Sequence, residues 1–315
     1  GPLRECFDKI CRDDTLGLDS WEQAESRMFE SAVRVALAKI KRQSDDLSCL
    51  LGGDLLNQII SSGFAAREIR APFIGLYGAC STISEGLMLG GMLVDGGFAE
   101  LAACAASSHF SAAERQFRYP LEMGVQAVPS SQRTVTGAGS IIIQAAGEFR
   151  PGAGNVFEHV ALTGGTIGSV EDFGITDANN MGAAMAPAAF KTIKTHLSDY
   201  SRRVEDYDRI ITGDLGIFGS DMLYELLRGE GIEIADRHED CGKLMFSPEQ
   251  NVNCGASGCG CAATVMSSWF LPKIESGEIR RVLFLATGAL MSPVSSLQGE
   301  SIPSIAHAVV IEHID

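Results

Sequence analysis

The sequence predicts an α/β protein that contains two similar halves, and three observations support this prediction. Segments with the apolar spacing of helices alternate along the chain with short apolar runs typical of strands. A stretch near residue 50 reappears in similar form near residue 210. Glycine contributes 35 of the 315 residues, a high share that suits many tight turns between strands and helices. This alternation favours parallel strands that carry helices on both faces and are joined by right-handed crossovers.

The first half is expected to begin with a helix over 20–42. Apolar residues such as Ala24, Met28 and Ala32 recur there at helical spacing, and Ser20 is the expected N-cap. The chain next shows an apolar run at 47–52, which ends at two glycines and is typical of a strand. The later elements expected in this half are strands at 72–78, 101–107 and 134–145, helices at 57–69 and 81–94, and a polar loop at 108–133.

The second half is expected to begin with a strand at 156–162, where apolar and polar residues alternate. It then repeats the order of the first half. Helices are predicted at 183–197, 220–228 and 262–274, and strands at 209–212, 232–235, 282–286 and 306–312. We therefore divide the chain into an N-terminal half, residues 1–150, and a C-terminal half, residues 151–315.

A residue-level repeat indicates that the two halves arose by duplication. Residues 45–55 align with 205–215 at a constant offset of 160 and share the run Gly-Asp-Leu. At an offset of 181, Cys80 aligns with Cys261. Two ordinary strand-to-helix turns that merely look alike are the alternative explanation. The strand at 156–162 has no counterpart ahead of the first helix, so we expect the first half to lack its first strand.

The charge and the apolar pattern exclude two classes of protein. Forty acidic residues stand against 25 basic ones, which gives a net charge of −15 and argues against a nucleic-acid partner. No stretch approaches the 18 or so uninterrupted apolar residues that a transmembrane helix needs. The chain is therefore not expected to span a membrane unaided.

The nine cysteines favour free thiols. Their number is odd, no signal-peptide pattern is seen, and several lie in apolar or glycine-rich runs, which suits a reducing compartment. A zinc site is the alternative, but its spacings match no usual paired knuckle; its ligands would be Cys241, Cys254, Cys259 and Cys261. We expect no metal and no cofactor.

Cys80 is the candidate nucleophile because it stands where a predicted strand turns into a helix. A thiol there faces the positive end of the helix dipole, which favours the thiolate, and neighbouring backbone N–H groups could form an oxyanion hole. The small residues Gly78 and Ala79 would let a ligand approach. A buried structural cysteine is the alternative reading.

The duplicated βαβαβαββ pattern, with a cysteine at the head of the third helix, resembles the thiolase and ketoacyl-synthase superfamily. The resemblance implies halves stacked in an α-β-α-β-α arrangement and a nucleophilic cysteine at the position of Cys80. Within that superfamily, eight runs closely resemble the stage V sporulation protein AD family of spore-forming Firmicutes. These runs are 53–58, 73–82, 94–99, 107–109, 113–120, 174–177, 185–189 and 288–290.

This resemblance implies a binding role rather than catalysis. Members of the family belong to the machinery that moves dipicolinic acid, a pyridine with two carboxylates, into the developing spore. The expected ligand is dipicolinic acid, free or as its calcium chelate. The expected location is the periphery of the spore inner membrane, beside the membrane proteins of the same machinery. A homodimer is usual in the superfamily. The alternative function is an acyl-transferring thiolase-like enzyme with Cys80 as its nucleophile.

Claisen chemistry is disfavoured because a catalytic histidine is missing. The superfamily places one histidine in the second half, and the repeat maps that position to 211–214, which contains no histidine. Loss of an oxyanion donor of this kind costs on the order of 10²–10³ in rate. The second polar position falls at Cys259. A cysteine acts as a base in thiolases proper, so the enzymatic alternative remains open.

A dianion held by an acidic chain requires a local positive site. Arg115 and Arg118 are the expected carboxylate partners, and the rings of Phe117 and Tyr119 could stack on the pyridine. A solvated loop is the alternative for these arginines. The helix N-termini behind Cys80 and Cys261 could add N–H donors.

Four other residues complete the set of candidate ligand-binding residues, which also includes Cys80, Arg115 and Arg118. They are His109, Asp54, Cys259 and His307. Structural roles compete with ligand contact at each position: core packing for the histidines, and helix capping rather than calcium contact for Asp54 and its repeat partner Asp214.

Overall fold

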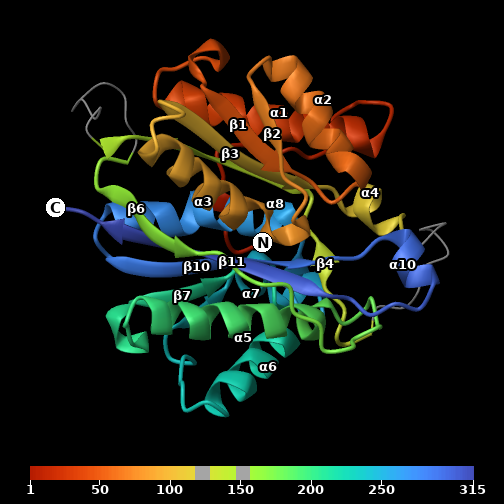
Figure 1. Ribbon diagram of the computed structural model, residues 1–315. Helices are drawn as coiled ribbons and strands as arrows, with labels where there is room; N and C mark the ends of the chain where they lie inside the picture. Colours follow the sequence, from red (N-terminus) through yellow and green to blue (C-terminus); the bar gives the residue numbers. More distant parts are fainter. Residues whose placement is uncertain (118–127, 147–156) are drawn as a thin grey trace.

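The structure is a computed structural model that describes residues 1–117, 128–146 and 157–315. Figure 1 shows five stacked layers: α1 and α2, a first sheet, α3 and α8, a second sheet, and α5 with α6. The first sheet has the strand order β2-β1-β3-β5 and the second has the order β6-β11-β10-β7-β8. A short pair, β4 with β9, joins the two halves. The layered α/β architecture expected from the sequence is therefore confirmed.

The helices and strands have the following bounds. The helices are α1 Trp21–Lys39, α2 Ile60–Ile69, α3 Thr82–Asp95, α4 Phe110–Glu114, α5 Met181–Asp199, α6 Gly216–Arg228, α7 Cys241–Met245, α8 Cys259–Val265, α9 Leu271–Glu275 and α10 Pro293–Leu297. The strands are β1 Cys49–Gly53, β2 Phe73–Gly75, β3 Leu101–Ser108, β4 Arg133–Thr134, β5 Gly137–Gln144, β6 Val160–Thr166, β7 Arg209–Thr212, β8 His238–Asp240, β9 Ala256–Ser257, β10 Arg281–Ala289 and β11 Ser304–His313.

The two sheets share one topology. In the first, β1 pairs in parallel with β2 and β3, and β5 runs antiparallel to β3. In the second, β7 pairs in parallel with β8 and β10, and β11 runs antiparallel to β10. The second sheet has a fifth strand, β6, antiparallel to β11. No described strand pairs with the second edge of β5 as β6 pairs with β11. Residues 1–48 contain no strand.

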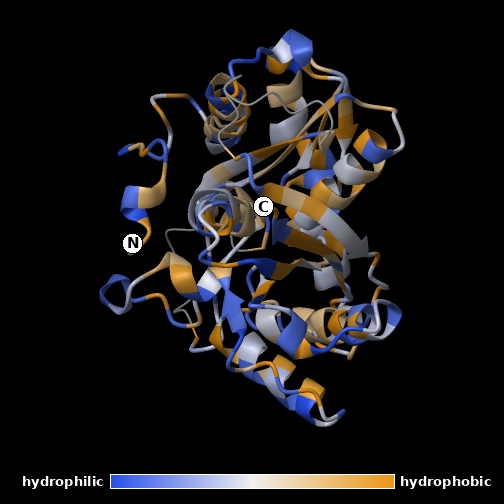
Figure 2. Ribbon diagram, turned by 90° about the vertical axis from the view of Figure 1, so that its left-hand side faces the viewer, coloured by the Kyte–Doolittle hydropathy of each residue, from blue (hydrophilic) through white to orange (hydrophobic). Residues whose placement is uncertain are grey.

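Helix α1 shows how the local sequence positions an outer layer. Ser20 caps it by accepting a hydrogen bond from the Gln23 amide at 3.2 Å, as its sequence pattern predicts. Phe29, Val33 and Leu37 recur at helical spacing and are buried against the first sheet. Figure 2 shows the same division across the molecule, with apolar residues concentrated in the strands and polar residues on the outer turns.

The central layer carries the largest apolar cluster. Helices α3 and α8 lie between the sheets and contribute Ile83, Leu87 and Cys261 to that cluster. Close approach of backbone makes part of this packing possible. A side chain at Gly139 of β5 would come within 2.4 Å of the Ala263 carbonyl oxygen in α8, so only glycine fits there.

The structure corrects several expected elements. The prediction of a strand at 232–235 is wrong. The Ile232 amide instead donates to the Leu227 carbonyl oxygen at the end of α6 (3.0 Å), and the strand in this part of the sheet is β8. The segment 72–78 contains only the short edge strand β2, which is partly exposed rather than buried. The expected loop at 108–133 contains α4, and the strand expected at 134–145 divides into β4 and β5.

The nine cysteines are all free, as the sequence predicts. Within the described ranges, no helix combines the length and the apolar character needed to cross a bilayer.

Replacement of Phe29 by Ala should destabilise the protein because the ring fills the contact between α1 and the sheet. Phe29 is fully buried, and its ring lies where a side chain at Gly52 would have to go. The expected loss is about 3–5 kcal/mol in the free energy of unfolding, measured by urea denaturation. Phe98→Ala is the matched control, because Phe98 is 83% exposed; its effect should stay within about 0.5 kcal/mol. Equal losses for the two variants would contradict the described packing.

Candidate functional site

The candidate site lies where the two central helices begin. Cys80 occupies a short 3-10 turn, Ala79–Ser81, that leads into α3, and Cys259 is the first residue of α8. The Cys259 thiol donates to the Ala79 carbonyl oxygen at 3.0 Å. Both cysteines are buried. The fold thus brings together two of the predicted site residues that are 179 positions apart in the chain.

The turn at Cys80 depends on tight backbone packing. Ala79 has a φ of +51°, a left-handed conformation that is unfavourable for a residue with a side chain. A side chain at Gly78 would come within 2.5 Å of the Ser81 hydroxyl and within 2.4 Å of the Glu85 carboxylate. A side chain at Gly288 would come within 2.1 Å of the Gly78 carbonyl oxygen. The second half therefore packs directly against the backbone of the Cys80 turn.

The electrostatic environment of Cys80 corrects the expectation of a thiolate. A hydrogen bond with Cys259, burial and the nearby Asp214 carboxyl group raise the pKa of Cys80 well above its usual value. Burial likewise raises the pKa of Cys259. The helix dipole acts in the opposite direction, but its effect at a helix end is typically only about 0.3–1 kcal/mol, less than one pKa unit. Cys80 is therefore a neutral thiol at pH 7.

Asp214 is the central polar residue of the site, although its sequence pattern predicts only helix capping or calcium contact. It occupies the 211–214 segment, where the sequence resemblance led us to expect a histidine. Its carboxyl oxygens accept hydrogen bonds from the Gly258 amide at 2.9 Å and the Thr287 hydroxyl at 3.1 Å, and it is also hydrogen-bonded to Cys80. Burial raises the pKa of Asp214 to about 7. The side chain therefore links β7, β10, α8 and the Cys80 turn.

The repeat partners Asp54 and Asp214 have different roles. Asp54 accepts hydrogen bonds from the Leu56 amide at 2.8 Å and from the amide and hydroxyl of Ser62, both at 2.7 Å. It therefore braces its own turn and the start of α2, which is the structural alternative that the sequence allowed. In the second half this task belongs to Asp240, which accepts from the Leu215 amide at 2.8 Å. Asp214 is thereby left available for the contact with Cys80.

Glu25 is a second buried acidic residue that the sequence did not indicate as a site residue. It is 1% exposed, accepts a hydrogen bond from the Ser107 hydroxyl at 3.1 Å, and has one buried carboxyl oxygen without a partner. Burial, reinforced by Asp54, raises the pKa of Glu25 well above its usual value. The available signal was its position on the same helical stripe as Phe29 and Val33, where an apolar residue belongs.

His109 and Arg115 are engaged in structural contacts. His109 caps α4: its Nδ1 accepts from the Ser111 amide at 3.1 Å, so Nε2 carries the proton and donates to the Asp14 carbonyl oxygen at 3.0 Å. Arg115 forms an ion pair with Glu22 and stacks over the Trp21 ring at 5.4 Å. Neither residue is among the groups that shift the pKa of Cys80.

Arg118, the other arginine of the expected carboxylate site, lies outside the described residues. The last candidate, His307, lies in β11 opposite Ala286 of β10 and is 7% exposed. Its Nδ1 accepts from the Gly168 amide at 3.3 Å, and burial lowers the pKa of its ring. Side chains of directly opposed residues project from the same face of a sheet, so His307 faces the central layer together with Ala286.

The site therefore consists of neutral or nearly neutral hydrogen-bonding groups rather than a charged catalytic pair. Cys80, Cys259 and Thr287 present thiols and a hydroxyl, and Asp214 is about half protonated near pH 7. Among the residues that the structure describes, no group of three histidine, cysteine or acidic side chains could hold a metal ion.

Comparison with solved structures defines the class of protein. OleA of Xanthomonas campestris matches with a TM-score of 0.59 over 98% of this chain and 89% of its own, at 14% identity. The 3-oxoacyl-(acyl carrier protein) synthase III of Pseudomonas aeruginosa PAO1 matches with a TM-score of 0.56 over 92% of this chain and 84% of its own, at 13% identity. The fold is therefore that of the thiolase-like condensing enzymes.

Comparison of sequences defines the family. Residues 1–312 match the Stage V sporulation protein AD family. A protein of Bacillus subtilis (strain 168) described as "Stage V sporulation protein AD" is 45% identical over 312 residues, which are 99% of this chain and 89% of that protein. This chain belongs to the Stage V sporulation protein AD family, as its sequence motifs led us to expect.

Asp214→Asn tests the buried carboxyl group through the pH dependence of stability. An aspartate in an unfolded chain titrates near 3.9, whereas burial raises the pKa of Asp214 to about 7 in the fold. The native state therefore binds this proton more tightly. Its contribution to stability is complete below pH ~4 and is lost as the pH rises through about 7. Relative to the variant, the native protein should lose up to about 1.4 kcal/mol per pH unit in this window.

Urea denaturation at a series of pH values measures this difference. Asp95→Asn is the matched control, because Asp95 is exposed at the end of α3. The stability of the control relative to the native protein should not change across the window. A constant difference between the native protein and Asp214→Asn from pH 4 to 8 would show that the Asp214 carboxyl group does not titrate as described.

Proposed function

We propose that this sporulation protein binds dipicolinic acid, free or as its calcium chelate, without catalysing a reaction on it, and so supports its uptake into the developing spore. The observation that carries the proposal is the buried Asp214, hydrogen-bonded to a Cys80 whose pKa is raised well above its usual value, in the 211–214 segment, which contains no histidine. The ligand itself follows from the resemblance of the sequence motifs to the sporulation family.

Acyl transfer would require the Cys80 thiolate, and the site opposes its formation. In cysteine enzymes a neighbouring histidine accepts the thiol proton and then stabilises the thiolate as an imidazolium. Asp214 cannot do this, because its ionised form places a second negative charge next to the sulfur and raises the pKa of Cys80. A developing oxyanion would meet the same repulsion. A pKa of about 7 would suit Asp214 as a base, but its electrostatic effect is opposite to the one required.

The helix dipole and uncharged side chains offer a way to hold carboxylates in a protein of net charge −15. Helix α3 begins at Thr82, directly after the Cys80 turn, so the positive end of its dipole lies there, while the Ser81 and Thr82 amides donate to the Gly78 and Ala79 carbonyl oxygens. The protonated form of Asp214, which is about half of the total near pH 7, and the neutral thiols carry no charge that would repel a dianion. The site therefore supports carboxylate binding better than acyl transfer.

Of the two arginines expected to bind the ligand, Arg118 is the one that we propose. Arg115 already forms an ion pair with Glu22 and stacks on Trp21, which limits its availability to a ligand. In our proposal Arg118 supplies the guanidinium group that pairs with a ligand carboxylate.

The proposal includes the location and the assembly of the protein. We place it at the periphery of the spore inner membrane, beside membrane proteins of the same machinery, as the family resemblance implies. We also propose that two copies pair through β2, an edge strand of the first sheet. Ile74 in β2, Tyr77 after it, and Phe64 in α2 are exposed large apolar side chains near that edge, which supports pairing.

Calorimetric titration with dipicolinate tests the binding proposal. The native protein should give a saturable heat, measured both with and without equimolar calcium to separate the two forms of the ligand. Arg118→Ala should weaken binding roughly ten-fold or more, because a charge-assisted hydrogen bond contributes about 1.5–3 kcal/mol. Arg115→Ala is the matched control and should change affinity less, because its partners lie within the protein. Absence of saturable heat under both conditions would overturn the proposal.

Incubation with acyl-CoA tests the enzymatic alternative. Intact-mass measurement should show no acyl adduct on the native protein, and no free CoA should accumulate, because Cys80 remains a thiol. Cys80→Ala serves as the reference for acylation elsewhere, including at the exposed Cys11. An adduct on the native protein that Cys80→Ala abolishes would instead establish acyl transfer at this site.

A further inference from the structure

Asp214 is a buried carboxyl group of the candidate ligand site that has uncharged hydrogen-bond partners. Its oxygens accept hydrogen bonds from the Gly258 amide and the Thr287 hydroxyl, and it is also bonded to the Cys80 thiol. Asp214 is fully buried, so water does not screen its charge as it does at the surface. An ionised Asp214 therefore acts strongly on any other charge that enters the site.

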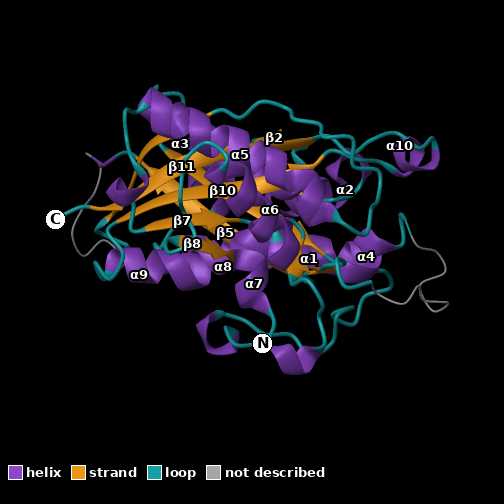
Figure 3. Cartoon of the chain, turned by 90° about the horizontal axis from the view of Figure 1, so that it is seen from below, coloured by secondary structure: helices purple, strands orange, loops and turns teal. Residues whose placement is uncertain are grey.

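Four thiols and one acid are the titratable groups that act on Asp214 from the elements packed around it. Asp214 follows β7, and Figure 3 shows α6, α7 and α8 gathered beside β7 and β8. The pKa of each thiol is raised above its usual value, so all four are neutral near pH 7. The groups are Cys80 of the 3-10 turn, Cys241 of α7, Cys259 and Cys261 of α8, and Asp240 of β8.

The other charged and basic groups on this side lie behind Asp240 or at the surface. Burial lowers the pKa of His238 in β8 to about 3, so its ring is neutral at pH 7. Lys243 of α7 is exposed, and its backbone amide, rather than its ammonium group, donates to Asp240 at 3.0 Å. Asp221 of α6 is also exposed. Water screens both of these surface charges.

The groups that approach the site from the first sheet and from β11 add no positive charge. Asp54 and Glu25 are buried acids that act on Cys259 from the side opposite Asp214 in the chain repeat. His307 of β11 has a pKa that burial lowers, so its ring is neutral at pH 7. The described side chains around Asp214 therefore leave its negative charge without a buried counter-ion.

We propose that binding of a dicarboxylate at this site is coupled to the uptake of one proton by Asp214, so that the affinity for the ligand falls as the pH rises. The inference rests on the proposed function, which places a dianion beside Asp214. Two negative charges in one buried site disfavour each other, and the protein carboxyl group is the one that can take up a proton. The Thr287 hydroxyl and the Cys80 thiol accommodate this proton, because each can accept a hydrogen bond as well as donate one.

The burial of Asp214 sets the pH range of the coupling. Burial raises the pKa of Asp214 to about 7 in the protein without ligand, and a bound dianion raises it further. The protonated form is therefore about nine-tenths of the total at pH 6, half at pH 7 and one-tenth at pH 8. Free carboxylic acids titrate near pH 4, so the ligand stays a dianion throughout this range. The affinity should fall about ten-fold between pH 6 and pH 8.

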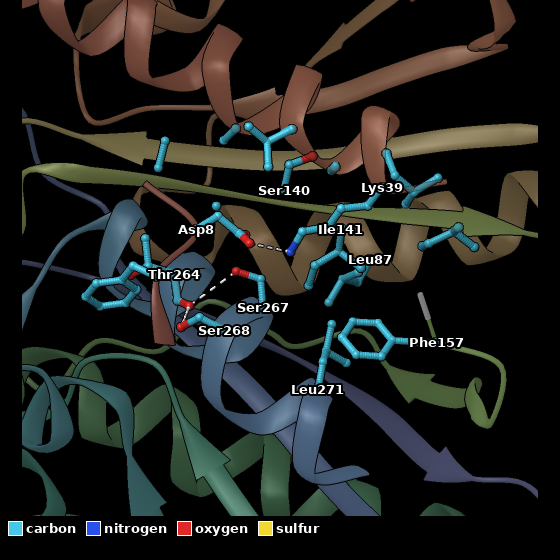
Figure 4. Close-up of a pocket in the computed structure, with 18 of the residues that line it drawn as sticks. Asp8, Lys39, Leu87, Ser140, Ile141, Phe157, Thr264, Ser267, Ser268 and Leu271 are labelled. Atoms are coloured by element: carbon cyan, nitrogen blue, oxygen red, sulfur yellow. Dashed lines mark hydrogen bonds and ion pairs between the residues drawn. The ribbon is translucent and has the colours of Figure 1, made fainter. Parts of the chain in front are cut away.

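The large cavity of the structure is a different place where an anion could bind. It has a volume of about 1040 Å³ and extends along β5. Figure 4 shows Lys39 in its wall, in an ion pair with Asp8 at 2.6 Å. Its described lining residues do not include Cys80, Asp214 or Thr287. The pH dependence of binding in that cavity would therefore not change when Asp214 is replaced.

Calorimetric titration with dipicolinate at pH 6, 7 and 8 tests the coupling, with two buffers of different ionisation enthalpy at each pH. The native protein should bind about ten-fold more weakly at pH 8 than at pH 6. The difference in heat between the buffers should show uptake of about half a proton per ligand at pH 7 and nearly one at pH 8. Binding of constant affinity without proton uptake would overturn the coupling and leave the proposed function intact. Absence of binding at all three pH values would overturn both.

Asp214→Asn identifies the group that takes up the proton. The amide oxygen can still accept from the Gly258 amide, but the side chain does not titrate. The affinity of this variant should change less than about two-fold from pH 6 to pH 8, without proton uptake. Asp95→Asn, at the exposed end of α3, is the matched control and should keep the native pH dependence. Native pH dependence in Asp214→Asn would overturn the inference, because another group would then carry the proton. The proton uptake of the native protein tests the coupling even if this variant does not fold.

Discussion

The structure depends on the packing of one helical layer between two sheets. Helices α3 and α8 touch both sheets, and their first residues meet at the Cys80 turn, where the Cys259 thiol is bonded to the Ala79 carbonyl oxygen. Asp214 fixes this meeting point because it accepts hydrogen bonds from both the head of α8 and β10. Without these contacts the two halves would share an apolar interface and no defined polar site.

The polar groups near this layer show that the site is kept at the expense of stability. Glu25, Asp54, Asp214 and Asp240 are all buried, and burial raises the pKa of each. A buried carboxyl group favours folding only in its protonated form once its pKa exceeds that of the unfolded chain. An apolar core would avoid this penalty. Retention of so many acids around two thiols is typical of a functional site, and the proposed binding of a dianion is favoured by the protonated form of Asp214.

The two halves differ at equivalent positions. Asp54 braces its own turn in the first half, whereas its repeat partner Asp214 is hydrogen-bonded to Cys80 and Asp240 braces the corresponding turn of the second half. This difference lies where the symmetry of the fold would predict identity, and it coincides with the site that we connect to function.

The sequence by itself determined the fold class, the repeat and the family, because helical spacing, strand-like runs and the Gly-Asp-Leu repeat are local patterns. It also placed Cys80 at the head of a helix. It could not identify the protonation state of that thiol, which depends on Cys259 and Asp214, far away in the chain. It likewise could not show that Arg115 and His109 are engaged by Glu22, Trp21 and Asp14. Only the tertiary structure decided these points, because hydrogen bonding and burial are set by neighbours that folding brings together.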